Sequence, residues 1–388
     1  MLAIVAPGQG SQKPGFLAPW LALPGAEARL RWWSTLAGVD LVRLGTEADA
    51  DEIRDTATTQ PLLVAAALLA AEHLPLQEVA VVAGHSVGEL AAAALGGVLS
   101  PETAITLAGA RGREMAAACA LEPTGMSAIL GGDPDEVLAA IGAAGLYPAN
   151  RNSSGQVVAA GSLAGLEKLA AQPPAKARVI ALQVAGAFHT PYMAPAEQAL
   201  ASFTEGITTG TPTKILLSNL DGSAVGQGPA MLARLVKQVT APVRWDLCMT
   251  SLAAIGVTAV IELPPAGTLA GLIKRELKDR GIEVLTVNTP DDLAAARDAI
   301  SRHSGAPSHE PVLQFQVVVS PIAGTFAPAA DLHEGAQLRS GQVIGRINTR
   351  DSATEVTAHE AGVLAEWLAH DNDPVASGQP LARIGGHL

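Results

Sequence analysis

One short segment of the sequence has the residue types and spacing of a nucleophile on a sharp turn. The segment GHSVGE (84–89) lies between the apolar run 79–83 and an alanine-rich stretch. A G-x-S-x-G pattern between a strand and a helix is typical of a nucleophile elbow, which projects its serine alone at the carboxyl end of a sheet. Gly84 and Gly88 lack the side chains that would clash in so tight a turn. We therefore predict Ser86 as a nucleophile; the alternative is an ordinary glycine-rich turn.

A serine nucleophile needs a general base, and histidine is scarce in the first 290 residues. Only His73, His85 and His189 occur there. His85 adjoins the serine, so its side chain should leave the turn in another direction, and His73 ends an apolar helix as a surface or cap residue does. By elimination we predict His189, in GAFHTPYM, as the base, although a lone histidine is more often structural.

The oxyanion that forms in acyl transfer needs two hydrogen-bond donors. The backbone N–H of Val87, next after the nucleophile, is the first candidate. The segment PGQGSQ (7–12) follows the first apolar run and is rich in glycine, so its backbone can approach a ligand closely. We choose Gln9 as the second donor; taken alone, this segment would be an ordinary turn.

Arg111 is the candidate for binding an anion. It lies on a predicted helix that begins at Ser100 and Pro101, and small residues around it leave room to enclose its guanidinium. Arg113 lies about 200° further around the helix, so only one of the two arginines can face inward. A buried arginine requires an anion, and a bidentate clamp on a carboxylate is a natural use of it. The alternative is a surface arginine.

Alternating strands and helices must position these residues. Apolar runs predict buried strands at 2–6, 79–83, 214–218, 257–263 and 283–287. Helical periods occur at 61–74, 101–118, 231–239 and 268–280. Nearly continuous apolar strands that alternate with helices indicate a parallel α/β sheet. The stretch 124–188 differs, because its pattern β-α-β-α-β predicts a small inserted α+β subdomain of ferredoxin-like type.

The composition and the pattern of apolar residues change after a helix predicted at 291–303. Residues 304–311 have the Ser, Gly, Pro and charged composition of a linker. Residues 312–388 contain short apolar runs separated by Gly, Pro, Asp and Asn, which predicts an all-β module. Within it, 333–347 resembles 370–384, and such a repeat fits a small sandwich of two interlocked halves. We therefore expect one domain over 1–303 and another over 312–388.

Composition restricts the class of protein. The 388 residues include 37 acidic and 25 basic side chains, a net charge of −12, and 48% are hydrophobic, which indicates a folded chain. The acidic balance argues against nucleic acid or an anionic membrane as the partner. No apolar run reaches the roughly 18 residues of a membrane helix. Two cysteines, Cys119 and Cys248, are too few for a disulfide framework or a cysteine metal site, so we expect no metal and a cytoplasmic location.

Taken together, the motifs resemble those of a known family. They occur in the order PGQGSQ, TQP (59–61), GHSVGE, RGREM (111–115), NSSGQVVAAG (152–161), GAFHTPYM and APVRW (241–245). In these motifs the first 290 residues resemble the malonyl-CoA:acyl-carrier-protein transacylases and the related acyltransferase domains of polyketide synthases. The resemblance implies an α/β-hydrolase-like parallel sheet that carries the inserted subdomain.

The resemblance also implies a ping-pong acyl transfer. Ser86 would attack the thioester of malonyl-CoA, the donor substrate, with His189 as base. The backbone amides of Gln9 and Val87 would hold the oxyanion, and Arg111 would pair with the free carboxylate of the malonyl group. The phosphopantetheine thiol of an acyl carrier protein would then take the acyl group.

Further substrate contacts are implied by the same resemblance. Gln60 and Asn152 stand at positions that would bind substrate. Phe188, directly before the predicted base, and Val87 should crowd a methyl group at C2 and so favour malonyl over methylmalonyl.

The sequence departs from the family pattern at Arg244, where glutamine is usual. The backbone carbonyl at this position is expected to orient His189, and that contact would survive the substitution. A positive charge nearby is expected to lower the pKa of the histidine.

Residues 312–388 resemble biotinyl or lipoyl carrier domains, in which a hairpin lysine carries the cofactor through an amide. The aligned turn here is TRDSAT (349–354), with Asp351 at the place of the lysine, and no lysine follows Lys278. A carboxylate cannot form that amide, so we expect no covalently bound cofactor. The module would either dock a carrier protein or another subunit, or be a vestigial stabilising cap.

Two other functions stay open. The chain could be a serine hydrolase that releases malonate to water, or a non-catalytic subunit of an acyl-transfer or carboxylase-type complex. Arg111 and Phe188 favour a closed malonyl site over a general hydrolase. The sequence leaves open which carrier protein is served and whether the pathway is fatty acid biosynthesis, polyketide biosynthesis or malonate metabolism.

Overall fold

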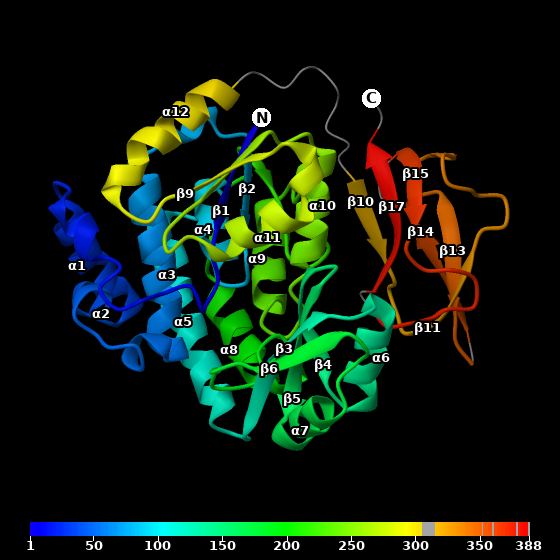
Figure 1. Cartoon of the computed structure of the whole chain (residues 1–388). Helices are drawn as coiled ribbons and strands as arrows, with labels where there is room; N and C mark the ends of the chain where they lie inside the picture. Colours follow the sequence, from blue (N-terminus) through cyan, green and yellow to red (C-terminus); the bar gives the residue numbers. More distant parts are fainter. Residues whose placement is uncertain (305–314, 351, 359–360, 378, 387–388) are drawn as a thin grey trace. The chain divides into compact units, whose positions relative to one another are not determined.

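The chain forms two compact units, Met1–Pro307 and Ser308–Leu388. The computed structural model describes residues 1–304, 315–350, 352–358, 361–377 and 379–386 (Figure 1). Residues 305–311 of the predicted linker, and Asp351, lie outside the described residues.

Unit 1 is built on a parallel sheet. The strands are β1 (Leu2–Ala6), β2 (Val81–Gly84), β7 (Ile215–Leu216), β8 (Ala259–Glu262) and β9 (Glu283–Thr286). They lie in the order β7-β2-β1-β8-β9, and every neighbouring pair is parallel. The prediction of an α/β fold with a parallel sheet is therefore confirmed. The apolar runs 214–218 and 257–263 are longer than their strands, because each run begins in the loop before its strand and continues into the loop after it.

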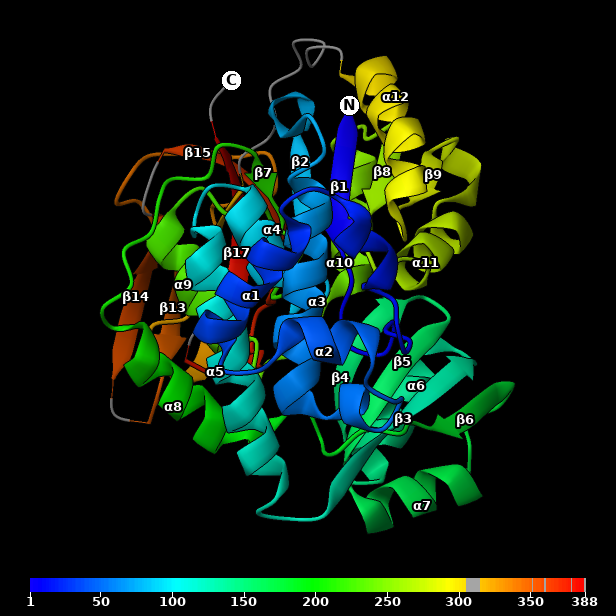
Figure 2. The ribbon, with the colours of Figure 1, turned by 90° about the vertical axis from the view of Figure 1, so that its left-hand side faces the viewer.

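The central strand β1 sends alternate side chains into two hydrophobic cores. Leu2, Ile4 and Ala6 pack in one core, and Ala3 and Val5 pack in the other. The first core includes residues of α3 (Thr56–Ala71), α4 (Gly88–Leu95) and α5 (Pro101–Cys119), and the second includes residues of α10 (Trp245–Ala254) and α11 (Thr268–Glu276). Figures 1 and 2 show helices over both faces of this sheet. A strand covered on both faces has no polar side, which explains the uninterrupted apolar run.

Five further helices of unit 1 contribute residues to the first core. They are α1 (Ala26–Ala37), α2 (Leu41–Thr46), α8 (Ala194–Thr204), α9 (Gly228–Lys237) and α12 (Leu293–His303). Helix α5 begins as predicted, because the hydroxyl of Ser100 accepts the N–H of Thr103. Helix α3 begins five residues before the predicted start at 61. The side chain of Asp55 caps it by accepting the N–H of Ala57, whereas the prediction took Pro61 for the first turn.

The inserted subdomain has one strand more than predicted. Its elements are β3 (Thr124–Gly131), α6 (Pro134–Ala143), β4 (Tyr147–Ser153), β5 (Gln156–Ser162), α7 (Leu163–Ala171) and β6 (Ala177–Ala181). The sheet order is β4-β5-β3-β6 with antiparallel pairs. Strand β4 was missed because YPANRNS is polar and contains a proline, so no apolar run marks it. With it, the order becomes β-α-β-β-α-β, which is that of ferredoxin-like units.

Unit 2 consists of two four-stranded antiparallel sheets, β10-β17-β15-β12 and β14-β13-β11-β16. The first four strands are β10 (Phe315–Val319), β11 (Gly324–Pro328), β12 (Gln337–Leu338) and β13 (Val343–Asn348). The last four are β14 (Ala353–Thr357), β15 (Gly362–Trp367), β16 (Pro374–Val375) and β17 (Pro380–Gly386). The repeat relates the strands in pairs: β10 to β14, β11 to β15, β12 to β16 and β13 to β17. Exchanging the members of each pair converts the strand order of one sheet into that of the other. The two sequence repeats therefore lie in interlocked halves around one core, which contains Phe326.

Within the part of the chain that the structure describes, no helix is long and apolar enough to cross a membrane. The same residues contain no cluster of three or more His, Cys, Asp or Glu side chains that could hold a metal ion.

Leu2→Ala should lower the free energy of unfolding by about 2–5 kcal/mol, because it removes methyl groups from the fully buried central strand. Leu121→Ala is the matched control, since it deletes the same atoms from a side chain that is 71% exposed, and it should change stability by less than about 0.5 kcal/mol. Urea unfolding followed by circular dichroism measures both. Equal losses in the two variants would contradict the core position of β1.

Candidate active site

Ser86 lies on the turn between β2 and α4, in a backbone conformation that non-glycine residues seldom adopt. Its φ is +53°. The turn is closed by contacts between backbone atoms. A Cβ on Gly84 would lie 2.1 Å from the carbonyl of Gly88, and a Cβ on Gly88 would lie 2.3 Å from the carbonyl oxygen of Ala6. Since backbone atoms cannot swing aside as the end of a side chain can, both glycines are required here.

The imidazole of His189 is oriented to act as a base toward Ser86. Its Nε2 lies 2.8 Å from the hydroxyl oxygen of the serine, and its Nδ1 lies 2.7 Å from the backbone carbonyl oxygen of Gln238. A carbonyl oxygen only accepts hydrogen bonds, so Nδ1 carries the proton and Nε2 presents its lone pair to the serine. The backbone of His189 is also left-handed, with φ +60°.

The prediction that the carbonyl at position 244 orients the histidine is wrong, because the carbonyl of Gln238 does so. The N–H of Arg244 donates to the carbonyl oxygen of Asn219 over 2.8 Å, and its guanidinium pairs with Asp246 at 2.9 Å. This arginine is therefore occupied by a neighbouring carboxylate.

The pKa of His189 is lowered to about 3, first by burial and then by the positive charge of Arg111. The cation that acts on the base is thus Arg111 and not Arg244. At neutral pH the ring is uncharged, which is the state that can accept a proton from a hydroxyl group.

Arg111 is a buried cation beside Ser86, the predicted nucleophile. The residue is 4% exposed; its Nη1 donates to Oε1 of Gln60 over 2.5 Å, and its Nη2 lies 3.3 Å from the hydroxyl oxygen of Ser86. Burial lowers the pKa of Arg111 to about 10, so it stays charged at neutral pH. No ion pair joins it to a carboxylate among the described residues. Arg113 faces outward, where it donates to the carbonyl of Ala37. A buried guanidinium in this state favours an anionic ligand.

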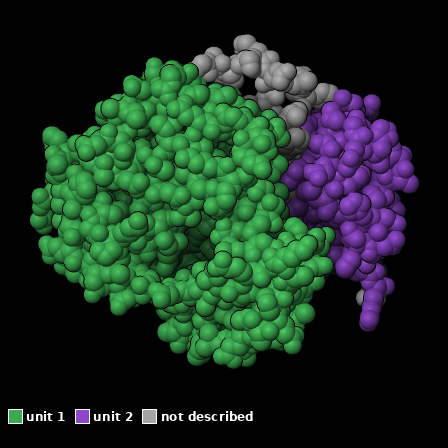
Figure 3. All heavy atoms as spheres, in the orientation of Figure 1, with its two compact units in different colours: residues 1–307 green, residues 308–388 purple. Residues whose placement is uncertain are grey.

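A cavity of about 500 Å³ opens at this place. Figure 3 shows the surface of unit 1 hollowed between the part built on the parallel sheet and the small subdomain. Every residue that the sequence analysis proposed for the site lines this cavity: Gln9, Gln60, Ser86, Val87, Arg111, Asn152, Phe188 and His189. The fold thus brings together side chains that lie up to 180 positions apart in the sequence.

Two of these residues use their side chains for local structure. The Oδ1 of Asn152 lies 2.9 Å from Nε2 of His85, so the amide ties strand β4 of the small subdomain to the turn that holds the nucleophile. His85 is thus engaged by Asn152, and it lines the same cavity as His189. The Nε2 of Gln9 donates to the carbonyl oxygen of Arg54 over 3.3 Å, so the side chain of this cavity-lining residue is held by the backbone.

Sequence reasoning missed three residues that hold the site. Gln238 acts through its backbone carbonyl, which no residue type reveals. The side chain of Asn219 accepts the N–H of Ser86 over 2.7 Å, and Glu89 is a buried carboxyl whose pKa burial raises to about 8. One signal was available for Asn219, because it directly follows the apolar run 214–218, and the carboxyl ends of parallel strands meet at one edge of a sheet.

Comparison with known proteins shows which family the chain is similar to. The acyl transferase domain family matches residues 4–296. A malonyl CoA-acyl carrier protein transacylase of Mycobacterium tuberculosis is 56% identical over 298 residues, which cover 76% of this chain and 98% of that protein. The transacylase of the same name from Escherichia coli is 34% identical over 304 residues, covering 76% of this chain and 98% of its own length.

Solved structures give the same result. The crystal structure of MCAT from Mycobacterium tuberculosis superposes with a TM-score of 0.74 at 55% identity, covering 76% of this chain and 99% of that one. A complex of a type II PKS acyl-carrier protein with its malonyl-transacylase gives a TM-score of 0.71 at 32% identity, covering 77% of this chain and 99% of that chain.

Replacing Arg111 by glutamine should raise the pKa of His189, because the guanidinium charge disfavours the imidazolium ion. The ring of the wild type should stay neutral as the pH falls from 8 to about 4, whereas the ring of Arg111→Gln should gain its proton at a higher pH. Nuclear magnetic resonance of the labelled ring measures both titrations. Arg113→Gln is the control, since this exposed arginine lies outside the cavity, and an identical titration in all three proteins would show that the charge does not act on the base.

Proposed function

The chain belongs to the acyl transferase family and, within it, to the malonyl CoA-acyl carrier protein transacylases, and we propose that its malonyl transfer proceeds through an ester on Ser86. Its activity moves a malonyl group from malonyl-CoA to the phosphopantetheine thiol of an acyl carrier protein. The observation that carries the mechanism is the position of Ser86 Oγ, which lies 2.8 Å from the base and 3.3 Å from a buried cation.

In the first half-reaction His189 takes the proton of Ser86, and the serine oxygen attacks the thioester carbonyl carbon. The backbone amides of Val87 and Gln9, which both line the cavity, donate to the oxyanion. When the intermediate collapses, the carbon–sulfur bond breaks and the CoA sulfur takes the proton from the imidazolium. The malonyl group is then esterified to the serine.

The second half-reaction reverses the roles. The thiol of the carrier protein gives its proton to His189 and attacks the ester carbonyl carbon. The serine oxygen leaves and regains its proton from the imidazolium. The carrier protein departs as the malonyl thioester, and the site returns to its starting state.

Arg111 binds the free carboxylate of the malonyl group. Only one methylene separates this carboxylate from the reacting carbonyl, so the cation that binds it must lie close to the nucleophile, as the 3.3 Å distance from Nη2 to Ser86 provides. Gln60 holds the other nitrogen and so fixes the orientation of the guanidinium. An acetyl group has no carboxylate and would leave a buried charge unpaired, which disfavours acetyl-CoA.

The walls of the cavity support malonyl over methylmalonyl. Phe188 is 6% exposed and Val87 is 1% exposed, and both line the cavity beside the base and the nucleophile. Side chains so tightly enclosed cannot move aside for an added methyl group at C2.

We further propose that unit 2 is a biotinyl- or lipoyl-like module without a covalent cofactor. Its hairpin between β13 and β14 is closed by the N–H of Thr349, which donates to the carbonyl of Ser352 over 2.8 Å. The resembled family carries its lysine at this turn, and this chain has no lysine after Lys278. Such a module would position a carrier protein or another subunit. The two free cysteines support a cytoplasmic location.

Mixing the protein with malonyl-CoA should add one malonyl group to Ser86, detected by intact mass, which only a carrier thiol removes quickly. Arg111→Ala should reduce malonyl transfer by about 10²-fold or more and increase transfer of acetyl relative to malonyl. Arg113→Ala is the control and should behave as wild type. An unchanged acyl preference in Arg111→Ala would contradict the clamp, rapid loss of the adduct to water would indicate a hydrolase, and no adduct would indicate a non-catalytic subunit.

The module hypothesis has a test of its own. Asp351→Lys should make the chain a substrate for a biotin or lipoyl ligase, because it restores the missing amine at the hairpin turn, and mass spectrometry would detect the product. Arg350→Lys is the matched control one position away. Modification of the control alone, or of neither variant, would count against the alignment of this hairpin.

A further inference from the structure

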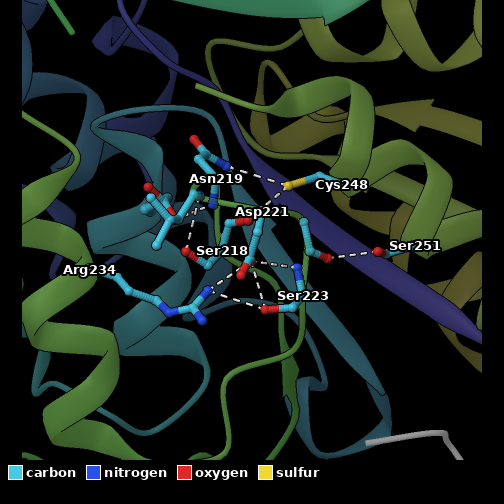
Figure 4. Close-up of polar contacts among 10 residues, drawn as sticks. Ser218, Asn219, Asp221, Ser223, Arg234, Cys248 and Ser251 are labelled. Atoms are coloured by element: carbon cyan, nitrogen blue, oxygen red, sulfur yellow. Dashed lines mark hydrogen bonds and ion pairs between the residues drawn. The ribbon is translucent and has the colours of Figure 1, made fainter. Parts of the chain in front are cut away.

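We propose that Asn219 is a positioning residue for the transfer reaction, which holds the strained backbone of Ser86, and that Glu89 holds Asn219 in turn. The inference rests on the proposed role of Ser86 and goes beyond it, because neither residue touches the reacting atoms. Figure 4 shows Asn219 among the polar side chains that surround it.

The side chain of Asn219 bridges the turn that carries the nucleophile. Its Oδ1 accepts the N–H of Ser86 over 2.7 Å, and its Nδ2 donates to the carbonyl of Gly84 over 2.7 Å. These two backbone groups lie on either side of His85. One planar amide thus satisfies both edges of the turn, and no other residue type of this size offers a donor and an acceptor in that arrangement without a charge.

This bridge continues the hydrogen bonding along β2 beyond the end of the edge strand β7. Strand β7 pairs with β2, and the N–H of Leu217 still donates to the carbonyl of Val82 over 3.0 Å. After that point the chain turns away, and the side-chain amide of Asn219 takes the partners that the next peptide of a longer strand would have bound. The turn is therefore held from the β7 side although β7 is only two residues long.

The backbone of Ser86 needs such a restraint. Its left-handed φ of +53° is costly for a residue with a Cβ and persists only where the surroundings enforce it. The peptide that follows carries the N–H of Val87, the proposed oxyanion donor. If Ser86 relaxed toward ordinary dihedral angles, both its hydroxyl and the N–H of Val87 would turn away from the substrate carbonyl.

Asn219 is itself held at both backbone atoms. Its N–H donates to Oε1 of Glu89 over 2.7 Å, and its carbonyl oxygen accepts the N–H of Arg244 over 2.8 Å. The second contact holds the segment 238–244, which also orients His189. In this segment the carbonyl oxygen of Gln238 accepts the N–H of the His189 ring, and the Nε2 of Gln238 donates to the carbonyl oxygen of Ala241. The placement of nucleophile and base is thus connected through one residue, which is completely buried.

Within the described part of the chain, the one hydrogen bond that Glu89 makes through its side chain goes to the N–H of Asn219, and its charge also helps to keep Arg111 protonated. Glu89 is 1% exposed, and its Oε2 has no hydrogen-bond partner among the described residues, which is costly for a buried carboxyl group.

Other contacts hold the loop of Asn219. The Nδ2 of Asn219 also lies 3.6 Å from the sulfur of Cys248. The loop itself is stiffened by Asp221, which pairs with Arg234 at 2.8 Å (Figure 4).

Two substitutions test the proposal. Asn219→Ala removes both hydrogen bonds, and Asn219→Asp keeps the shape but, when ionised, can only accept from Ser86 and cannot donate to the carbonyl of Gly84. The readout is the rate at which a fluorophosphonate labels Ser86, since this probe reports any activated serine and does not depend on malonyl-CoA. Leu252→Ala, at a fully buried position on α10, is the control for loss of stability alone.

We expect Asn219→Ala to label about 10²-fold more slowly than wild type, with a KM for malonyl-CoA within about threefold of wild type, because Arg111 is untouched. Leu252→Ala should melt earlier yet label at the wild-type rate. Labelling of folded Asn219→Ala within about threefold of wild type would overturn the proposal.

The second substitution gives a pH signature that a purely structural role would not produce. The introduced carboxyl would lie beside Cys248 on α10 and near Glu89 on α4. Glu89 is in turn influenced by the charges of Asp221 in the same loop as Asn219, Arg234 on α9 and Arg111 on α5. A protonated carboxyl has one donor and one acceptor, as the amide has. The labelling rate of Asn219→Asp relative to wild type should therefore rise as the pH falls from 8.5 to 5.5.

The pH dependence of this ratio of labelling rates tests the positioning role of Asn219 even if Asn219→Ala does not fold. A ratio that stays constant between pH 8.5 and 5.5 would refute the proposal. Failure of the proposed function gives a different result: a wild type that the probe labels but malonyl-CoA does not acylate would remove the malonyl assignment and leave the role of Asn219 intact.

Discussion

The structure depends on one sharp turn, in which Ser86 has a left-handed backbone between the end of β2 and the start of α4. The turn requires glycine at 84 and 88, because backbone atoms of the neighbouring residues occupy the space of any Cβ. It also requires partners on its open edge, which β1 and Asn219 supply: the N–H of His85 donates to the carbonyl of Ala6, and that of Ser86 to the amide of Asn219. The parallel sheet therefore positions Ser86, the proposed nucleophile.

Burial has two consequences in the cavity that this turn creates. It lowers the pKa of Arg111 to about 10, and together with the charge of that arginine it lowers the pKa of His189 to about 3. An anion bound to Arg111 would reduce the first effect and, by cancelling the charge, would raise the basicity of the imidazole. The carboxylate of the proposed substrate would thus both bind Arg111 and raise the basicity of His189, the proposed base.

The second unit follows a different principle. Its eight strands form two sheets, and the internal repeat relates the strands of one sheet to those of the other. The two sheets enclose a hydrophobic core that belongs to unit 2 alone. The family match ends at residue 296, and 98% of the Mycobacterium tuberculosis relative is covered by 298 aligned residues. Unit 2 is therefore additional to the transacylase fold of that relative.

By itself, the sequence determined the parallel α/β class, the elbow at Ser86 and the set of residues that line one cavity. These features were readable because each depends on residue type and local spacing: apolar runs for strands, glycines for a tight turn, a scarce histidine for a base. Strand β4 was not readable, because its polar residues are held by pairing with β5 and not by an apolar face.

Only the tertiary structure decided how the site is held. The carbonyl of Gln238, and not that of residue 244, orients His189, since every residue has a carbonyl and only its position in space distinguishes it. Asn219 bonds to a turn 133 residues earlier, and the cation of Arg111 reaches an imidazole far along the chain. Hydrogen-bond geometry and charge both depend on distance through space, which one-dimensional spacing does not contain.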